Sequence, residues 1–461
     1  MTDVANDARV ERGVKRDLRR MRKAQQLRNR ELMLLIFAIA ITISAFVLVQ
    51  FGALGALDMG PLTIIGAICV LAIALHVVLR IRASQADPFL LPIALTLTGV
   101  GTSMIYRLDL DSTPATAAGM HQMAYAAVSM ALCGVVVWTL ANYRVLFRYT
   151  YIFGFVGLVL LVLPFIPFLN GGGNATVWIS IAGFNFQPGE IAKICLAIFF
   201  AGYLVRTRES LTSTGTKILG FTFPRAREFG PLLVIWAVSM VVIVAQRDLG
   251  TGLLIFGMFV AMLYVATGKT GWVLIGVILA IGGAVAASFV MPYVHNRFTT
   301  WLDAFDDSLY NDPAGGSFQL VNGIFGLAHG GMFGTGLGQG RPGLTPVANS
   351  DFIIPSLGEE LGLVGLFAIF ALYLVFVSRG ARIGVAGQDD FGKLLAVGLS
   401  FTLALQVFIM VGGVTRVIPL TGLTTPFLAA GGSSLLANWI IVAILLRVSD
   451  SVRRQPRAVI G

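Results

Sequence analysis

The stretch ELMLLIFAIAITISAFVLVQFGA at residues 31–53 decides the fold class, because it is almost free of charge and long enough to cross a bilayer as a helix. Runs of this kind recur along the whole chain of 461 residues, which is 56% hydrophobic and only 12% charged. A soluble globular domain carries about 25% charged residues. The chain is therefore predicted to be an all-α polytopic integral membrane protein.

Twelve apolar runs are long enough to form transmembrane helices. They cover residues 31–53, 61–82, 87–105, 119–141, 146–168, 188–206, 230–246, 249–267, 271–292, 352–378, 391–414 and 424–447. Only Gln246, Arg247 and Asp248 separate the seventh run from the eighth, which predicts a tight helical hairpin.

Lysine and arginine are distributed very unevenly between the two sides that these runs define. Of the 33 basic residues, 27 fall on the side of the N-terminus, ten of them in the predicted cytoplasmic tail 1–30; five fall on the other side, and Lys193 lies within a span. Cytoplasmic loops carry such an excess, so both termini are predicted to be cytoplasmic. The net charge of +10 then needs no nucleic-acid partner. Contact of the basic tail with anionic membrane lipids is expected instead.

The longest connection on the opposite side covers residues 293–351. Long connections without regular structure are usually functional or disordered. This one contains eight Trp, Tyr and Phe residues, which are rare in disordered segments. An ordered extracytoplasmic loop that covers the bundle is therefore predicted.

Ionisable side chains within the predicted spans mark candidate functional sites, because they are costly in a membrane. Away from the cytoplasmic ends these are Glu190, Lys193, Asp248, Glu359 and Glu360, and all lie in the outer half. The i, i+3 spacing of Glu190 and Lys193 allows them to pair. Together the five predict a polar cavity open to the outer leaflet. The alternative is a set of interfacial residues that snorkel or bridge helices.

Two other patterns carry less information. Three cysteines lie in apolar runs and four histidines lack paired spacing, so no zinc site is predicted. The segment GGMFGTGLGQG at 330–340 is similar to a phosphate-binding loop, but it lacks the strand and helix that such a loop needs. Its glycines allow either backbone approach to a lipid diphosphate or close helix contacts.

Five ordered motifs resemble those of the SEDS family, which includes RodA and FtsW, and the likeness is closer to RodA. They are WISIAGFNFQPGEIAK at 178–193, QRDLGT at 246–251, NDPAGGSFQL at 311–320, SDFIIPSLGEELGLVG at 350–365 and PLTGLTTPFLAAGGSSLLAN at 419–438. The resemblance implies a ten-helix core at 87–450, preceded by two additional helices at 31–86 and followed by a cytoplasmic tail at 451–461. Val177 departs from the family, which often has Arg there.

The resemblance implies an inverting peptidoglycan glycosyltransferase of the hexosyltransferase type. Such an enzyme polymerises lipid II into glycan strands on the outer face of the bacterial cytoplasmic membrane, during elongation and shape maintenance. The implied partner is a class B penicillin-binding protein, which crosslinks the growing strand. The implied catalytic residue is Asp312, which Pro313 holds in an extended conformation. Asp303, Asp306 and Asp307 are rival bases in the same loop.

The motifs and the buried charges together give a predicted substrate-binding set. It comprises Gln187, Glu190, Lys193, Asp248, Arg297, Trp301, Gln319, Asp351 and Glu359. One carboxylate would remove a proton from the attacking hydroxyl, and a cation would stabilise the leaving diphosphate. Lys193, Arg297 or a divalent cation (Mg²⁺ or Mn²⁺) can supply that charge, and no other cofactor is implied.

Three other functions remain open. A lipid II flippase or transporter would also use charges inside a helical bundle, although the sequence lacks an inverted repeat and a matched pair of broken helices. A scaffold that only recruits an enzyme leaves the buried charges unexplained. A division-specific polymerase like FtsW differs from an elongation enzyme in its cellular role.

Overall fold

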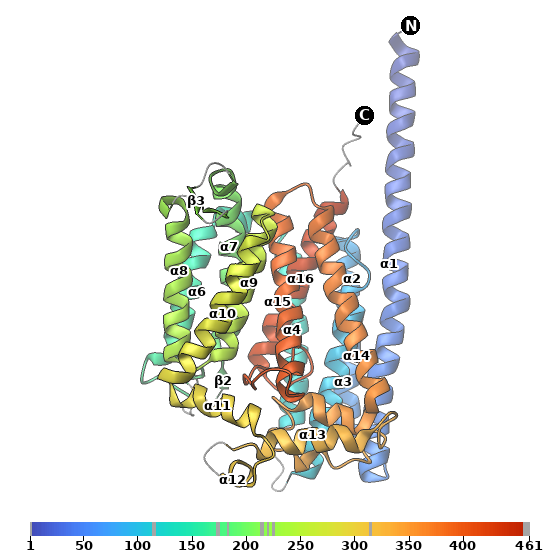
Figure 1. Ribbon diagram of the computed structural model, residues 1–461. Helices are drawn as coiled ribbons and strands as arrows, with labels where there is room; N and C mark the ends of the chain where they lie inside the picture. Colours follow the sequence, from blue (N-terminus) through green and yellow to red (C-terminus); the bar gives the residue numbers. More distant parts are fainter. Residues whose placement is uncertain are drawn as a thin grey trace.

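The computed structural model of the chain is a bundle of long helices that run between two ends (Figure 1). It describes residues 2–112, 117–171, 176–181, 184–212, 216–218, 221–223, 226–312 and 316–454. The α-helices are α1 (Thr2–Leu54), α2 (Met59–Arg82), α3 (Leu90–Asp111), α4 (Ala118–Thr139), α5 (Val145–Arg148), α6 (Thr150–Val162), α7 (Pro188–Thr212), α8 (Ala226–Ala245), α9 (Leu249–Thr267), α10 (Gly271–Val290), α11 (Pro292–Leu302), α12 (Asp307–Tyr310), α13 (Phe318–Gly330), α14 (Ile353–Ala386), α15 (Asp390–Val414) and α16 (Gly432–Arg454). Two 3₁₀ turns are η1 (Leu163–Phe165) and η2 (Pro342–Leu344), and two antiparallel hairpins pair β1 (Ile179–Ile181) with β2 (Phe184–Phe186) and β3 (Thr216–Ile218) with β4 (Phe221–Phe223).

The helical membrane fold predicted from the sequence is confirmed. Among the described residues, nine helices are long and apolar enough to cross a membrane: α1, α2, α4, α7, α9, α10, α14, α15 and α16. The other three predicted spans fall on α3, α6 and α8, of which α6 and the second half of α8 are shorter apolar helices. The count of twelve spans stays a prediction.

The two ends of the bundle carry different parts of the chain (Figure 1). The start of α1, the end of α16 and the β3–β4 hairpin lie at one end, here called the terminal end. Helices α11, α12 and α13 lie at the other, here called the cap end. The predicted long loop 293–351 therefore has regular structure and lies opposite both termini. The described residues of the predicted basic tail 1–30 are helical and belong to α1, which continues into the first apolar run.

Helices α1 and α2 precede the predicted family core and are held to it by buried polar contacts. Arg28 donates from Nη1 to Glu31 Oε2 at 2.5 Å, and His76 Nδ1 lies 2.7 Å from Glu31 Oε1. Arg28 also donates to the backbone carbonyl of Ala86, which lies just before α3. These contacts tie α1 to α2 and to the start of the core.

Helix α14 is broken at Gly362, whereas the sequence predicted one uninterrupted span there. Gly362 has φ 68° and ψ −176°, a conformation open only to glycine. The break frees backbone carbonyls, and the backbone N–H groups of Thr335 and Gly336 donate to those of Glu359 and Glu360 at 3.0 Å. The glycine-rich segment thus supplies hydrogen-bond donors to the carbonyls that the broken helix leaves free. Backbone groups inside a membrane protein need such partners.

The last predicted span, 424–447, begins too early. Helix α16 begins at Gly432, and residues 415–431 form a non-helical segment at the cap end, here called the 415–431 loop. Pro419 and Pro426 lack the N–H that a helix interior needs. The apolar composition of this loop made it similar to a helix in sequence.

Candidate active site

The ion pair predicted from the spacing of Glu190 and Lys193 is present in the first turns of α7. Lys193 Nζ donates to Glu190 Oε2 at 2.6 Å and to Gln406 Oε1 of α15 at 3.0 Å. All three residues are buried. The ammonium therefore has two acceptors, one charged and one neutral, which compensates its removal from water.

The 415–431 loop connects this pair to the rest of the cap end. Gln406 Nε2 donates to the carbonyl of Thr424 at 2.7 Å. Beyond the loop, the hydroxyl of Ser433 accepts the backbone N–H of Gln187 at 2.8 Å, just before α7. The start of α7 and the loop are thereby held against each other.

Arg297 of α11 contacts the same 415–431 loop. Its Nη1 donates to the carbonyl of Leu420 at 2.8 Å. Gly422 has φ +75°, and a Cβ there would lie 3.6 Å from Asp351 Oδ2 and 3.7 Å from Arg297 Nη2. At Gly422 the loop therefore comes close to both a guanidinium and a carboxylate, which belong to two other segments.

The carboxyl groups of Asp248 and Asp351 both interact electrostatically with Arg297. Asp248 accepts the backbone N–H of Thr251 at 3.0 Å and caps α9. It interacts electrostatically with Glu190 and with Arg297. Burial raises the pKa of Asp351; the Asp248 charge acts in the same direction, whereas Arg297 opposes it. Five predicted residues (Glu190, Lys193, Asp248, Arg297 and Asp351) therefore form one cluster, here called the cap-end cluster.

Trp301, predicted to bind substrate, joins α11 to the 415–431 loop. Its Nε1 donates to the carbonyl of Arg416 at 3.0 Å, and Arg416 donates back to the carbonyl of Trp301 from Nε at 3.1 Å and from Nη2 at 2.9 Å. These reciprocal bonds hold α11 against the start of the 415–431 loop. Trp301 thus positions the helix that carries Arg297.

Glu359 belongs to a second group of charges. Its Oε1 accepts the backbone N–H of Arg341 at 2.7 Å. The neighbouring Glu360 accepts Arg107 Nε at 3.1 Å and the backbone N–H of Gly338 at 2.8 Å. Both carboxylates hold the glycine-rich segment against α14 and α3. Of the two roles that its glycines allowed, close packing is the one that these contacts support.

Asp312 lies in an exposed turn between α12 and α13. Its backbone N–H donates to the carbonyl of Leu309 at 3.4 Å, and its carbonyl accepts the backbone N–H of Gly316 at 3.1 Å. A Cβ at Gly316 would overlap the carbonyl of Leu309, so only glycine closes the turn this tightly. The backbone of the predicted base is therefore held. Pro313, on which its extended conformation was argued, lies outside the described residues.

The other acidic residues of the same segment are exposed and occupy helix ends. Asp303 follows α11, and Asp306 caps α12 by accepting the backbone N–H of Ser308 at 2.8 Å. The side chain of Ser308, and then its backbone, lower the pKa of Asp306, which makes Asp306 a weaker base. Gln319 is half-buried in the first turn of α13.

Two buried residues of these groups were missed by the sequence analysis. Gln406 was not singled out, because an amide carries no charge that would mark it in an apolar run. Arg107 was placed in an outer connection, but α3 extends to Asp111 and buries it. The ion pair between Arg107 and Asp111 has i, i+4 spacing, which was the available signal.

No group of three His, Cys, Asp or Glu side chains suited to a metal forms among the described residues. A site built from protein ligands alone is therefore not seen in that part of the chain. Asp248 and Asp351 are suited to a cation that also binds substrate phosphate, because Mg²⁺ typically uses one or two carboxylates together with phosphate oxygens.

Comparison with known proteins places the chain in a family. Residues 87–454 match the family of FtsW, RodA and SpoVE, described as cell cycle proteins. Peptidoglycan glycosyltransferase RodA of Mycobacterium tuberculosis is 46% identical over 443 residues, covering 93% of this chain and 92% of the relative. RodA of Mycobacterium leprae is 44% identical, covering 94% and 92%. Stage V sporulation protein E of Bacillus subtilis is 31% identical, covering 81% and 96%. The matches to the two mycobacterial relatives cover 93% and 94% of this chain, so they include at least part of the segment 31–86 that precedes the family core.

Two solved structures share the fold. One, described as a peptidoglycan synthase complex that coordinates polymerization and crosslinking, has a TM-score of 0.64 at 22% identity and covers 80% of this chain and 99% of that chain. The crystal structure of the rod shape determining protein RodA of Thermus thermophilus has a TM-score of 0.52 at 21% identity and covers 80% and 98%. The sequence motifs, the fold and the relatives agree: the chain belongs to the FtsW, RodA and SpoVE family.

Proposed function

We propose that this chain is a peptidoglycan glycosyltransferase that polymerises lipid II into glycan strands at the cap end of the bundle. The observation that carries the proposal is the cap-end cluster, in which residues from four segments far apart in sequence meet at one end of a membrane bundle. Ionisable side chains gathered within a membrane bundle typically mark a functional site. The mycobacterial relatives, named peptidoglycan glycosyltransferases, support the same activity.

The proposed reaction exchanges one bond for another. The bond between the anomeric carbon of one saccharide and its diphosphate breaks, and its electron pair leaves with the lipid diphosphate. A hydroxyl oxygen of a second saccharide bonds to that carbon with inversion, and its proton passes to a carboxylate. The protein must supply a base near the hydroxyl and positive charge near the diphosphate.

Arg297 is the proposed contact to the diphosphate. Its guanidinium keeps donors beyond the one bound to Leu420, and Asp351 and Asp248 lie in its field. The ammonium of Lys193 is already bound to Glu190 and Gln406. Its proposed role is therefore to contribute positive charge to the site without contacting the diphosphate. Asp312 is the proposed base, because its exposed turn can meet a saccharide outside the bundle. A bound Mg²⁺ or Mn²⁺ would supply further charge, held by Asp248 and Asp351.

We further propose that the cap end faces outward, that the enzyme serves elongation and that its partner is a class B penicillin-binding protein. The outward orientation rests on the charge asymmetry of the sequence, which places the terminal end in the cytoplasm. The partner rests on the fold shared with a chain of a peptidoglycan synthase complex. The elongation role rests on the likeness to RodA.

A flippase is the second candidate, favoured by the broken helix α14. The carbonyls at that break accept hydrogen bonds from the glycine-rich segment of the same chain. They are therefore occupied by protein donors and do not face a path for the lipid. Purified chain in vesicles with fluorescent lipid II separates the two functions. We expect long glycan products from the wild type and from Arg80→Gln, an exposed control at the terminal end, and none from Lys193→Met. Movement of lipid II across the bilayer without polymer formation would instead establish the flippase.

A further inference from the structure

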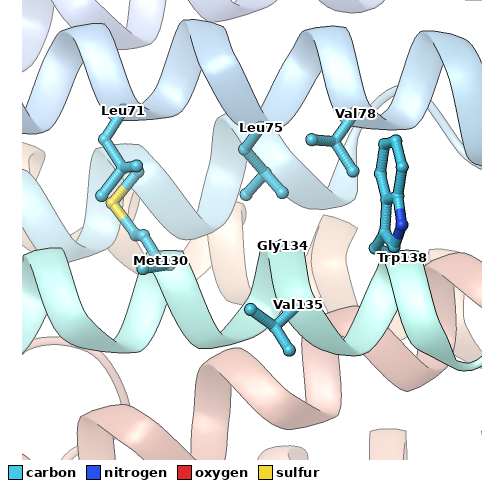
Figure 2. A pocket seen from close by; sticks show the side chains of 8 residues that line it. Leu71, Leu75, Val78, Met130, Gly134, Val135 and Trp138 are labelled. Carbon is cyan, nitrogen blue, oxygen red and sulfur yellow. The ribbon is translucent and has the colours of Figure 1, made fainter.

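An apolar groove runs between α2 and α4, outside the candidate active site (Figure 2). It has a volume of about 330 Å³ and is lined by Leu71, Leu75, Val78, Met130, Ala131, Gly134, Val135 and Trp138. Gly134 forms part of its floor, because no side chain fills the space there (Figure 2). One wall is α2, which belongs to the N-terminal addition, so the groove is not a feature of the ten-helix core.

The groove ends at an arginine. The guanidinium carbon of Arg82 lies 4.0 Å from the centre of the Trp138 ring, which forms the end of the groove toward the terminal end. Arg82 is exposed, and no acidic side chain lies within ion-pair distance of it in the part of the chain that the structure describes. Arg447 and Arg454 both donate to the backbone carbonyl of Arg82, which brings two more cations to the same place. Asp450 is the anion bound to those two.

The dimensions of the groove decide what can occupy it. From Met130 to Trp138 it extends about 12 Å along α4, less than half of the ~30 Å hydrocarbon core. A partner's transmembrane helix is about 10–12 Å wide and would need a longer and larger groove. Part of a single acyl chain fits the length and the volume of the groove. Because lipid tails are as apolar as the groove itself, burial alone gives no selectivity, and the charge at its end must supply it.

We propose that this groove binds an anionic phospholipid of the leaflet at the terminal end. One acyl chain lies between α2 and α4, and the phosphate lies at Arg82. Basic pockets between transmembrane helices are known to bind such headgroups. Trp138 stacks on the guanidinium and keeps it directed toward the mouth of the groove.

The test is lipid binding to the purified full-length chain, followed by native mass spectrometry with phosphatidylglycerol or phosphatidylcholine. We expect tighter binding of phosphatidylglycerol in the wild type. Arg82→Gln should weaken it about fivefold, since one basic residue near an anionic surface contributes about 1 kcal/mol. Arg80→Gln is the matched control, because Arg80 is exposed on the same helix but is bound to Asn29 instead. It should retain wild-type binding.

Gly134→Leu tests the apolar part. A Cβ at Gly134 meets only Leu75 at an ordinary 3.6 Å, so the larger side chain should fill the groove without disturbing the helix. It should weaken binding of both lipids. If this variant unfolds, Ala131→Leu fills the groove from an exposed position. Equal weakening by Arg82→Gln and Arg80→Gln would overturn the proposal. Wild-type lipid binding in the filled variants would also overturn it. So would a second protein that copurifies with the wild type but not with the filled variants, if the wild type shows no preference for phosphatidylglycerol.

Discussion

At the scale of single residues, Lys193 shows how the bundle accommodates a charge. Its ammonium lies 2.6 Å from Glu190 and 3.0 Å from Gln406, so two of its three N–H donors have protein acceptors in place of water. The Glu190 contact follows from i, i+3 spacing and was predictable. The Gln406 contact joins residues 213 positions apart, and no local pattern announces it. Sequence spacing thus gave one partner and the fold supplied the other.

The ion pair should behave as a unit. Glu190→Gln or Lys193→Met alone leaves a buried charge without its partner, which costs about 3–5 kcal/mol. The double variant should lose far less than the sum of the two single effects, as measured by chemical or thermal unfolding of the purified chain. Adding Gln406→Leu to the double variant should cost more, because it also removes the hydrogen bond from Gln406 Nε2 to the carbonyl of Thr424. Additive losses would show that the two charges do not interact.

Asp351 should give the protein a specific pH dependence. Burial raises the pKa of its carboxyl in the folded protein, so ionisation favours unfolding. The wild type should therefore lose stability as pH rises from the ordinary aspartate pKa of about 3.9 through the raised folded value. Asp351→Asn should lack this loss, melting higher than wild type at pH 7 and equally at acid pH. Exposed Asp307→Asn is the control, and a wild-type pH profile in Asp351→Asn would refute the assignment.

At the scale of elements, helices were predicted well and their interruptions were not. Hydrophobic runs located every long helix, because membrane spans need length and apolarity alone. The break in α14 and the extended 415–431 loop have the same apolar composition as the helices beside them. What distinguishes them is hydrogen bonding to other segments, such as Thr335 to the carbonyl of Glu359. The cap-end cluster depends on that loop, so its geometry could not be read from the chain.

Gly362 tests the break directly. A Cβ there would overlap the backbone of Gly334 in the glycine-rich segment, and its φ and ψ are open only to glycine. Gly362→Ala should therefore destabilise the protein by at least about 1–3 kcal/mol. Gly282→Ala in α10 is the matched control, since a Cβ there meets open space and should be neutral or stabilising by up to about 1 kcal/mol. Equal melting temperatures for the two variants would mean that α14 is continuous.

For the whole molecule, the proposed function requires that the two ends of the bundle lie on opposite faces of the membrane. The predicted cytoplasmic face holds the start of α1, the end of α16 and the β3–β4 hairpin, and the predicted outer face holds α11 to α13 (Figure 1). The native cysteines Cys69, Cys133 and Cys195 are all buried, so background labelling should be low. In intact cells, a cysteine replacing Asp306 should react with a membrane-impermeant thiol reagent, and one replacing Lys217 should not. The reverse pattern would put the candidate site on the wrong side for glycan synthesis.

In the proposed reaction, the carboxylate of Asp312, in the turn between α12 and α13, accepts the proton of the attacking hydroxyl. Polymerisation of labelled lipid II by purified Asp312→Asn measures it most directly, because the substitution keeps the size of the side chain and removes its basicity. The account predicts loss of polymer, with thermal stability near wild type because Asp312 is exposed, and a milder effect of Asp303→Asn. Near wild-type polymerisation by Asp312→Asn would contradict it, and would favour Asp303 or a metal-bound water as the base.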